Sequence, residues 1–365
     1  MQHIQKKLQF EQKDSITDEM FTEYSIFLDI ETTGFSPASS SLYLIGCMRR
    51  IQDTLLIDKF FAENSSEEPM ILQAFQKLSQ GYSTILTFHG EGFDIPYLNA
   101  KNDAYHIPSS LESFISIDLY KRISSMKALL KLPNYKQKTI ESFLGIDRKD
   151  LYSGGELIKV YESYTQKYSA EFLSILLLHN FEDVTGMLDL LPMLSYHQIL
   201  QGDYQIESSK IASFTDYNGK EKKELHITLT NSYHVPKRIS CQFQSFYLTI
   251  QNNTTKIRVE IFEGELKYFF ANYKDYFYLP QEDTAIHKSV AEFIDKSYRE
   301  RAKSSNCYTR KNSLFLPQYS KIIEPEFKLA HKDKLTYFEL TEDFLVSNEK
   351  LNDYILHIFR NIPKK

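Results

Sequence analysis

Cysteine is scarce in this chain, and tryptophan is absent. The three cysteines, Cys47, Cys241 and Cys307, lie far apart and form no CxxC pattern. An odd number of widely spaced cysteines argues against a framework of disulfide bonds. Because unpaired cysteines are typical of compartments that keep thiols reduced, this content predicts a cytoplasmic protein.

Long hydrophobic runs and a strong excess of one charge are also missing. The longest apolar runs, such as FLSILLLHNF at residues 172–181, are too short to span a membrane. The N-terminal sequence MQHIQKKLQFEQKD has no apolar segment of the kind found in secretory signals. We therefore expect no membrane partner. The formal net charge is −5, so the total charge does not indicate a nucleic acid partner.

The composition is that of a soluble globular protein, with 42% hydrophobic and 25% charged residues. A length of 365 residues is sufficient for two domains. The charge is distributed unevenly between the two parts of the chain. Residues 1–200 contain 18 Lys and Arg against 26 Asp and Glu, whereas residues 201–365 contain 25 against 22. The first part is therefore acidic and the second part slightly basic.

Strand and helix patterns alternate in the first part of the chain. Apolar β-rich runs predict strands at residues 24–31, 42–51, 56–63 and 83–90, and a short strand leading into a helix at 113–126. Apolar residues spaced three and four apart predict helices at 66–81, 94–105 and 138–145, and two more within 155–196. This order indicates an α/β domain with a mixed sheet over residues 24–200. A polar, partly helical extension is expected at residues 1–23.

The pattern changes after Gly202. Alternating strands are separated by Asn-Gly, Asn-Asn and Glu-Gly turns, which predicts an antiparallel meander. A basic helix is expected at residues 284–303 and a C-terminal helix at 349–362. Residues 205–365 are therefore predicted to form a smaller α+β domain.

Two acidic side chains mark the end of the first predicted strand. In FLDIETTGF, residues 27–35, Asp29 and Glu31 point to the same side because successive strand residues alternate between the two faces. Neighbouring carboxylates repel each other unless a positive charge lies between them. The pair therefore indicates either a bound cation or a sheet edge where both acids are hydrated.

Two later segments carry side chains that could join this pair. Asp94 follows a predicted strand at the turn into a helix, and such strand ends line the ligand crevice of open α/β sheets. His179 and Asp183 are four residues apart and share one face of a helix. Clustered carboxylates suit Mg²⁺ or Mn²⁺, and two such ions about 3.5–4 Å apart can promote phosphodiester hydrolysis. The predicted ligands of these two ions are Asp29, Glu31, Asp94 and Asp183.

Three motifs built on these residues resemble those of the DEDD superfamily of 3′–5′ exonucleases. They are DIETTG at residues 29–34, HGEGFD at 89–94 and HNFED at 179–183. The stretches SIDLYKRI and TIESFLGIDRKDLYSGGELIKVYESY resemble the YprB-like branch of that superfamily. The resemblance covers about residues 22–196 and implies an RNase H-like fold in which the four acids bind metal.

The resemblance also implies which residue activates the attacking water. In this superfamily it is usually Tyr four positions before the last Asp, or His five positions before it. Here His179 stands four positions before Asp183, and Leu178 stands five before it. His179 therefore occupies the site of the tyrosine, where a neutral imidazole could serve as the general base.

Three other residues are expected to contact the substrate. Thr32 and Thr33 match residues that approach the 3′-terminal nucleotide, and His89 stands where many members have Asn. Asp118 follows a predicted strand and precedes a helix, so we expect it to cap that helix rather than to join the site.

A basic segment in the second part offers a further nucleic acid surface. Residues 287–311 carry seven Lys and Arg against three Asp and Glu, and Tyr298 and Tyr308 are interleaved with them. Aromatic side chains among cations can stack on bases, although a solvated amphipathic helix would have the same composition. The candidate contacts are Lys288, Arg299, Arg301, Arg310 and Lys311.

The predicted function is a metal-dependent 3′–5′ exonuclease that hydrolyses single-stranded DNA or RNA with two Mg²⁺ or Mn²⁺ ions. The partner would be a single-stranded 3′ end. Two alternatives remain open at this point. One is a weakly active or inactive nucleic-acid-binding or scaffold protein: the presence of all four acids argues against it, and the spacing of His179 keeps it open. The other is a structure-selective endonuclease that uses the same carboxylates.

Overall fold

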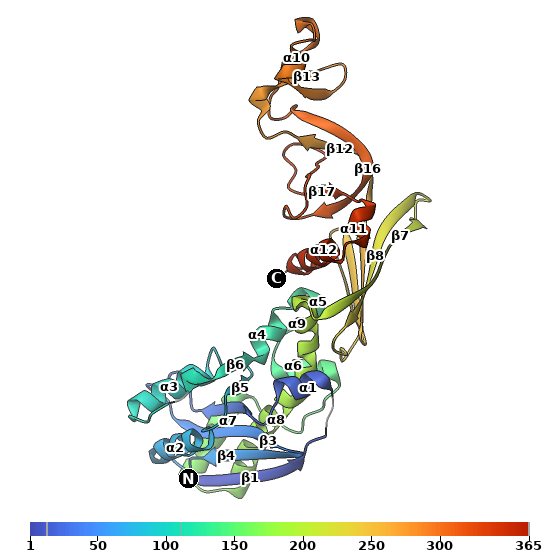
Figure 1. Cartoon of the computed structure of the whole chain (residues 1–365). Coiled ribbons are helices and arrows are strands. Elements are labelled where there is room, and N and C mark those ends of the chain that lie inside the picture. The colour runs from blue at the N-terminus through green and yellow to red at the C-terminus, as the bar shows by residue number, and fades with distance from the viewer. Residues whose placement is uncertain (12–13, 110, 364–365) are drawn as a thin grey trace. The chain divides into compact units, whose positions relative to one another are not determined.

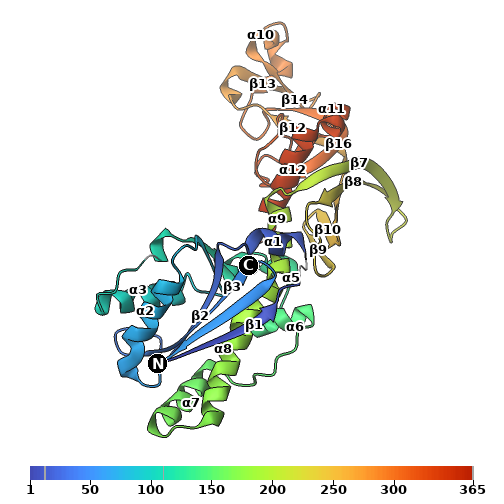
Figure 2. The same cartoon turned by 60° about the horizontal axis from the view of Figure 1, so that its bottom comes forward.

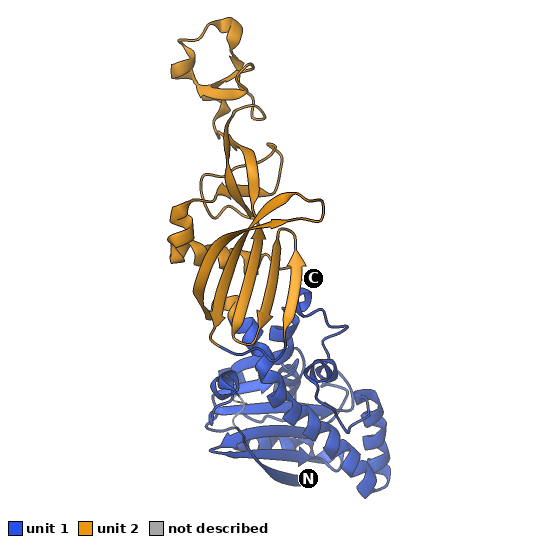
Figure 3. Ribbon diagram, turned by 90° about the vertical axis from the view of Figure 1, so that its right-hand side faces the viewer, with its two compact units in different colours: residues 1–198, 233–237, 364–365 blue, residues 199–232, 238–363 orange. Residues whose placement is uncertain are grey.

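The computed structural model of the protein describes residues 1–11, 14–109 and 111–363. These residues divide into two compact units (Figure 3). Unit 1 comprises residues 1–198 and 233–237, and unit 2 comprises residues 199–232 and 238–363. No helix among the described residues is both long and apolar enough to cross a membrane.

Unit 1 is built on a six-stranded mixed sheet, which confirms the predicted α/β class (Figure 1). The strands are β1 (Gln2–Gln9), β2 (Ser25–Thr32), β3 (Leu42–Ile51), β4 (Thr54–Phe61), β5 (Thr84–Thr87) and β6 (Ile115–Asp118). Their order across the sheet is β1-β4-β3-β2-β5-β6. The pairs from β1 to β2 are antiparallel, and β2, β5 and β6 run parallel.

Strand β1, within the segment expected to be a polar extension, is an edge strand of this sheet. Strand β1 pairs with β4 along its whole length, from Gln2 opposite Phe61 to Gln9 opposite Thr54. An edge strand has a neighbour on one side only and tolerates polar and charged side chains. The polar composition of the segment therefore reflects its position at the edge. Helix α1 (Ser15–Met20) follows it.

Helices cover both faces of the sheet (Figure 2). On one face lie α2 (Glu68–Leu78) and α3 (Asp94–Ala104), and on the other lie α7 (Gly154–Gln166) and α8 (Ala170–Leu190). The other helices are α4 (Leu119–Ser124), α5 (Lys127–Leu130), α6 (Gln137–Leu144) and α9 (Leu194–Gln201). Helix α6 ends at Gly145, which has a φ of +84° as the expected C-cap. Asp118 accepts a hydrogen bond from the Lys121 backbone N–H, so it caps α4 as predicted.

Strand alternation separates apolar and acidic side chains along β2. Leu28 and Ile30 belong to a buried cluster with Phe75 of α2 and Leu98 of α3. A second buried cluster, on Phe61 of β4, is formed by side chains of α7 and α8. Because successive strand residues point to opposite faces, the acidic residues beside Leu28 and Ile30 point toward the layer that contains α8.

Unit 2 contains three antiparallel sheets. The first has the order β7-β8-β11-β10-β9, the second β12-β16-β17 and the third β14-β13-β15. The strands are β7 (Tyr204–Thr215), β8 (Glu221–Asn231), β9 (Ile239–Phe243), β10 (Phe246–Gln251), β11 (Thr254–Glu260), β12 (Phe262–Phe269), β13 (Tyr276–Leu279), β14 (Thr284–His287), β15 (Glu300–Arg301), β16 (Tyr308–Gln318) and β17 (Thr336–Glu339). The helices are α10 (Lys288–Ala291), α11 (Glu342–Val346) and α12 (Asn348–Arg360).

Two features of unit 2 differ from the sequence prediction. The five-stranded sheet is not a simple meander, because β8 pairs with β11 instead of β9. The expected basic helix at 284–303 is replaced by β14, the single turn α10 and β15, since β13 pairs with both strands. Pairing with β13 outweighs the local helical spacing of this segment.

Candidate active site

The two acids of β2 lie side by side on the face that α8 covers. Asp29 accepts a hydrogen bond from Asn180 Nδ2 of α8 at 2.8 Å. Burial raises the pKa of Glu31 to about 8. Burial, followed by the charges of Asp183, Glu31 and Asp94, raises the pKa of Asp29 well above its usual value. The pair is therefore not a hydrated sheet edge but part of a buried group of acids.

Asp94 reaches this group from the first residue of α3. Strand β5 pairs with β2 only from Ser25 to Phe27, so the edge of β2 beyond that point is open. The backbone N–H of Ile30 at this open edge donates to Asp94 Oδ1 at 3.1 Å. Burial raises the pKa of Asp94 to about 7. The early end of β5 therefore leaves a place for this carboxylate beside β2.

Helix α8 contributes His179 and Asp183 from one face, as their spacing predicted. His179 Nε2 lies 3.0 Å from Asp183 Oδ2 and 3.7 Å from Glu31 Oε1. Glu31, His179 and Asp183 each offer one atom that could bind a metal ion, and these three atoms lie within 4.8 Å of one another. The structure thus brings together the four predicted acids and the predicted base, although they come from three elements.

Asp150, which the sequence analysis did not single out, orients the imidazole of His179. Its Oδ2 atom lies 2.7 Å from His179 Nδ1 and 2.7 Å from Lys138 Nζ. Burial alone would lower the pKa of His179. The hydrogen bond to Asp183 and the charges of Glu31, Asp183 and Asp150 outweigh burial and raise that pKa to about 9. A carboxylate on Nδ1 fixes the orientation and tautomer of a histidine, which leaves Nε2 directed at the acids.

Arg148 is the second residue that sequence reasoning missed. Its Nη1 atom donates to Asp183 Oδ1 at 2.5 Å, and its Nη2 atom donates to Glu141 Oε1 at 2.7 Å. Burial would raise the pKa of Asp183, but the contacts with His179 and Arg148 lower it. Both oxygens of Asp183 are therefore engaged in this state. Arg148 and Asp150 lie in the segment between α6 and α7, which has no periodic pattern that could have marked them.

Gly46 makes room for Asn180 beside the acids. It stands opposite Asp29 in the β2–β3 pair. A Cβ atom at Gly46 would lie 1.9 Å from Asn180 Oδ1. Because Gly46 has no side chain, Asn180 has room to donate its hydrogen bond to Asp29.

We expect Gly46→Ala to destabilise the protein by about 1–3 kcal/mol, because the methyl group would overpack the buried contact with Asn180. Equilibrium denaturation with urea measures this change. Gly155→Ala is the matched control, since a Cβ atom there would meet nothing within 4 Å. Equal stability of the two variants would contradict the role assigned to Gly46.

A cleft of about 520 Å³ opens onto Asp29 and Asp183. The other residues that line it are Phe88, His89, Tyr120, Asn134, Tyr135, Lys136 and Gln137. The ring of His89 packs edge-on against Tyr120, with centroids 4.7 Å apart. Asp118 accepts from the backbone N–H of His89 at 3.0 Å, so the helix cap also holds this loop. Asp29 and Asp183 therefore lie at a cleft whose walls combine aromatic and polar side chains.

The two threonines predicted to contact substrate hold the turn after β2. Thr32 Oγ1 donates to the Gly34 carbonyl at 2.8 Å, and Thr33 Oγ1 accepts from the Ser41 backbone N–H at 2.8 Å. Neither threonine lines the described cleft. Their contact with a substrate therefore remains a prediction.

The five predicted cations of the basic segment already have partners within unit 2. Lys288 pairs with Asp275 at 2.8 Å, Arg310 with Glu265 at 3.4 Å and Lys311 with Glu339 at 2.5 Å. Arg299 and Arg301 lie over the Phe277 ring at 4.9 and 4.7 Å. Their predicted role in binding nucleic acid stays a prediction.

The chemistry of the acid cluster fits a divalent cation. The candidate ligands offer carboxylate oxygens and no thiolate, which is the donor set that Mg²⁺ and Mn²⁺ prefer. The raised pKa values of Asp29, Glu31 and Asp94 show more negative charge than the buried site accommodates on its own. A cation among these acids would offset that excess.

Without metal, we expect the protein to lose stability as the pH rises from about 4, near the pKa values of Asp and Glu in the unfolded chain, to about 9. Glu31, Asp94 and His179 have pKa values of about 8, 7 and 9, each above the value of the unfolded chain. The folded state therefore holds protons that the unfolded chain has released, so its stability falls as these groups titrate. Thermal melts in EDTA measure this, and Mn²⁺ should restore the Tm most at high pH.

Glu31→Gln is the control for that measurement, because glutamine cannot titrate. Its Tm in EDTA should depend less on pH than that of the unaltered protein. Identical pH dependence in the two proteins would show that Glu31 does not contribute.

Comparisons with known proteins give one family match and several matches to solved structures. Residues 26–195 match the family described as the RNase_H superfamily. A comparison with curated proteins found no match. Among solved structures, the family B DNA polymerase from the hyperthermophilic archaeon Pyrobaculum calidifontis has a TM-score of 0.38 and 16% identity. That similarity covers 47% of this chain and 25% of the polymerase chain.

E. coli exonuclease I is also similar in structure. Its complexes with a 5cy-dA13 and with a dA16 oligonucleotide have TM-scores of 0.32 and 0.31, each with 11% identity. Each match covers 57% of this chain and 54% of the exonuclease chain, so this chain spans about half the length of that enzyme. The residues 26–195 that match this family model contain all four acids and His179.

Proposed function

We propose that this protein is a metal-dependent 3′–5′ exonuclease that acts on single-stranded DNA or RNA. The observation that carries the proposal is the convergence of Asp29, Glu31, Asp94 and Asp183 with His179 beside a cleft that Asp29 and Asp183 line. These acids would hold two Mg²⁺ or Mn²⁺ ions, which when bound supply Lewis-acid charge to the phosphate. The 3′–5′ direction rests on the resemblance of the three motifs to the DEDD superfamily.

His179 would act as the general base. Its Nε2 atom faces Glu31 and Asp183, and Asp150 holds the opposite ring nitrogen. To accept a proton from water, the imidazole must first be neutral. Positive charge among the neighbouring acids would lower its pKa from about 9 and favour that neutral form.

The walls of the cleft suit the end of a single strand. Phe88, Tyr120 and Tyr135 offer aromatic surfaces on which bases can stack, and Lys136 offers a cation for a phosphate. Stacking on aromatic rings requires bases that are not enclosed in a duplex. The lining therefore supports a single-stranded substrate.

A catalytically silent, nucleic-acid-binding protein is the second candidate, and one observation favours it. Arg148 and His179 occupy both oxygens of Asp183, so a cation at Asp183 has to compete with Arg148. If a cation does not displace Arg148 from Asp183, the charges of Arg148 and His179 would balance the carboxylates, and the cluster would not require a metal ion.

The experiment that tests the proposal uses 5′-labelled single-stranded oligonucleotides, as DNA and as RNA, with Mg²⁺, Mn²⁺ or EDTA. A ladder that shortens from the 3′ end, and that EDTA abolishes, is expected. Cleavage of a circular single strand would instead identify an endonuclease. If the protein binds the oligonucleotide but does not cleave it with either metal, the proposed exonuclease activity is wrong and the inactive nucleic-acid-binding protein is supported.

A further inference from the structure

The five-stranded sheet of unit 2 has one apolar face and one polar face. Leu225, Ile227 and Leu229 of β8 are buried, as are Leu248 of β10 and Ile257 of β11. The residues between them point the other way and are cationic, aromatic or hydroxyl-bearing. They are His226, Thr228, Tyr247, Thr249, Lys256 and Arg258.

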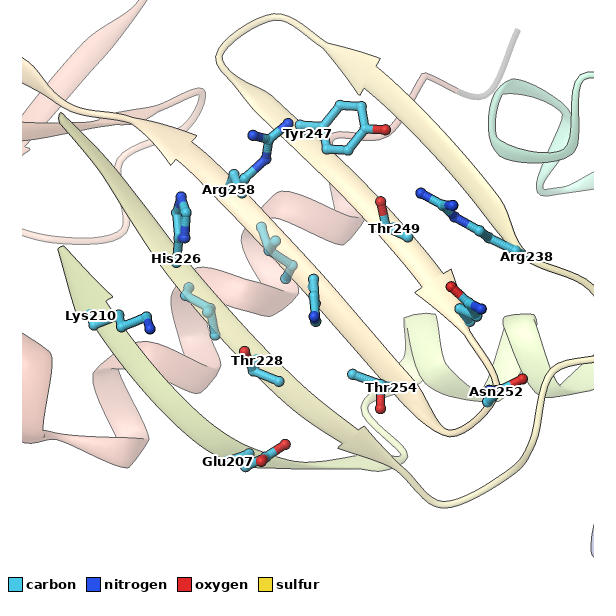
Figure 4. A pocket seen from close by; sticks show the side chains of 14 residues that line it. Glu207, Lys210, His226, Thr228, Arg238, Tyr247, Thr249, Asn252, Thr254 and Arg258 are labelled. Carbon is cyan, nitrogen blue, oxygen red and sulfur yellow. The ribbon is translucent and has the colours of Figure 1, made fainter. Parts of the chain in front are cut away.

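This polar face is hollowed. A depression of about 860 Å³ lies over strands β7 to β11, and Figure 4 shows the side chains that rise into it. Lys210 comes from β7, Arg258 from β11 and Tyr247 from β10, while Arg238 immediately precedes β9. Residues far apart in the sequence thus share one concave surface within unit 2, which we call the basic sheet face.

Three of the four cations on the basic sheet face form no ion pair among the described residues, whereas the fourth, Arg258, lies 3.7 Å from Glu224 Oε2. Four of its lining residues are Lys or Arg, and Glu207 is the single acid among them. Among the described residues, no ion pair is formed by Lys210, Arg238 or Lys256. In the basic segment at 287–311, by contrast, the five predicted nucleic acid contacts pair with carboxylates or lie over an aromatic ring.

The remaining lining residues are suited to nucleotides. The Arg258 guanidinium lies over the Tyr247 ring at 4.5 Å, so the two make a planar platform. Thr228, Thr249 and Asn252 add hydroxyl and amide groups to the same surface. Cations combined with an aromatic platform and polar donors are the features of sheets that bind single strands. The face has too few apolar side chains for a membrane or a hydrophobic protein partner.

We propose that the basic sheet face binds the phosphodiester backbone of single-stranded nucleic acid. This inference rests on the proposed function for the identity of the polymer. Lys210, Arg238, Lys256 and Arg258 would contact phosphates, and the platform of Tyr247 would contact a base. Binding is expected to be insensitive to sequence and sensitive to salt, because its main contacts are between charges.

The test measures binding of a 5′-fluorescein-labelled dT 20-mer and U 20-mer to the full chain by fluorescence anisotropy, with EDTA present. Lys210→Glu/Lys256→Glu is expected to weaken binding by at least about tenfold. It should also lower the slope of log affinity against log salt by about 1.4, the loss of two phosphate contacts. Lys332→Glu/Lys334→Glu changes the net charge equally on exposed lysines outside the face and should bind as the unaltered protein does.

The outcomes separate this inference from the proposed function. Unchanged affinity of Lys210→Glu/Lys256→Glu would overturn the inference even if the protein cleaves its substrates. Loss of binding in that variant, from a protein that cleaves neither DNA nor RNA, would support the binding face and refute the exonuclease. An equal loss in both double variants would show a general effect of net charge and overturn the inference. Circular dichroism melts verify folding, and the single Lys256→Gln replaces the double variant if it is unfolded.

Discussion

Replacing Asp29 with asparagine is expected to reduce metal-dependent cleavage by about 10³-fold without destabilising the metal-free protein. Metal ions supply several kcal/mol of transition-state stabilisation, and about 4 kcal/mol corresponds to a factor of about 10³. Asp29 is a predicted ligand, and its amide analogue would lack the charge that holds a cation. The measurement is kcat/KM with a 5′-labelled single strand and Mn²⁺.

The stability part of this prediction follows from the surroundings of Asp29. Burial and the neighbouring acids raise its pKa, so either its charge or its proton costs free energy in the folded protein. Asparagine avoids this cost and can still accept the hydrogen bond from Asn180. The Tm of Asp29→Asn in EDTA should therefore equal or exceed that of the unaltered protein.

Asp58→Asn is a control that should lose stability and keep activity, the opposite of what is expected for Asp29→Asn. Asp58 of β4 is fully buried, and it contacts Arg49 Nε at 3.0 Å and His3 Nε2 at 2.8 Å, outside the acid cluster. Breaking a buried ion pair costs about 3–5 kcal/mol. This variant should lose stability but keep the activity of each folded molecule. Full activity of Asp29→Asn, or equal loss of activity in both variants, would refute the role of Asp29.

The second large effect is expected for His179→Gln, which should lower kcat/KM by about 10²–10⁴-fold. A general base contributes a factor of this size, and glutamine cannot accept the proton although it has a similar length and polarity. The effect should appear in kcat rather than in the affinity for the oligonucleotide. Unchanged cleavage by His179→Gln would place the base elsewhere and make the histidine a structural residue.

Asp150→Asn separates positioning from catalysis. Its carboxylate contacts His179 Nδ1 but lines neither the cleft nor the cation site. Loss of this charge would lower the pKa of His179, because Asp150 is one of the groups that raise it. The limb of the pH–rate profile that belongs to the base should therefore move to lower pH, together with a smaller loss of kcat than in His179→Gln. A profile that does not move would refute the coupling.

Much of the candidate site could be predicted from the sequence because it depends on local periodicity. The alternation of β2 places Asp29 and Glu31 on one face, and the turn of α8 places His179 above Asp183. Both patterns follow from the local geometry of a strand or a helix and do not depend on contacts with distant segments. The mixed sheet and the caps at Asp118 and Gly145 were predictable for the same reason.

The tertiary structure alone decided which other groups complete the site. Arg148 and Asp150 reach Asp183 and His179 from a segment about 30 residues away, and no spacing rule connects them. The pairing of β1 with β4 and of β8 with β11 likewise joins strands that are not neighbours in sequence. Periodicity determines which way a side chain points, but packing between distant segments determines what it meets. The sequence by itself therefore determined the acids and their faces, while tertiary packing decided their partners and the basic sheet face.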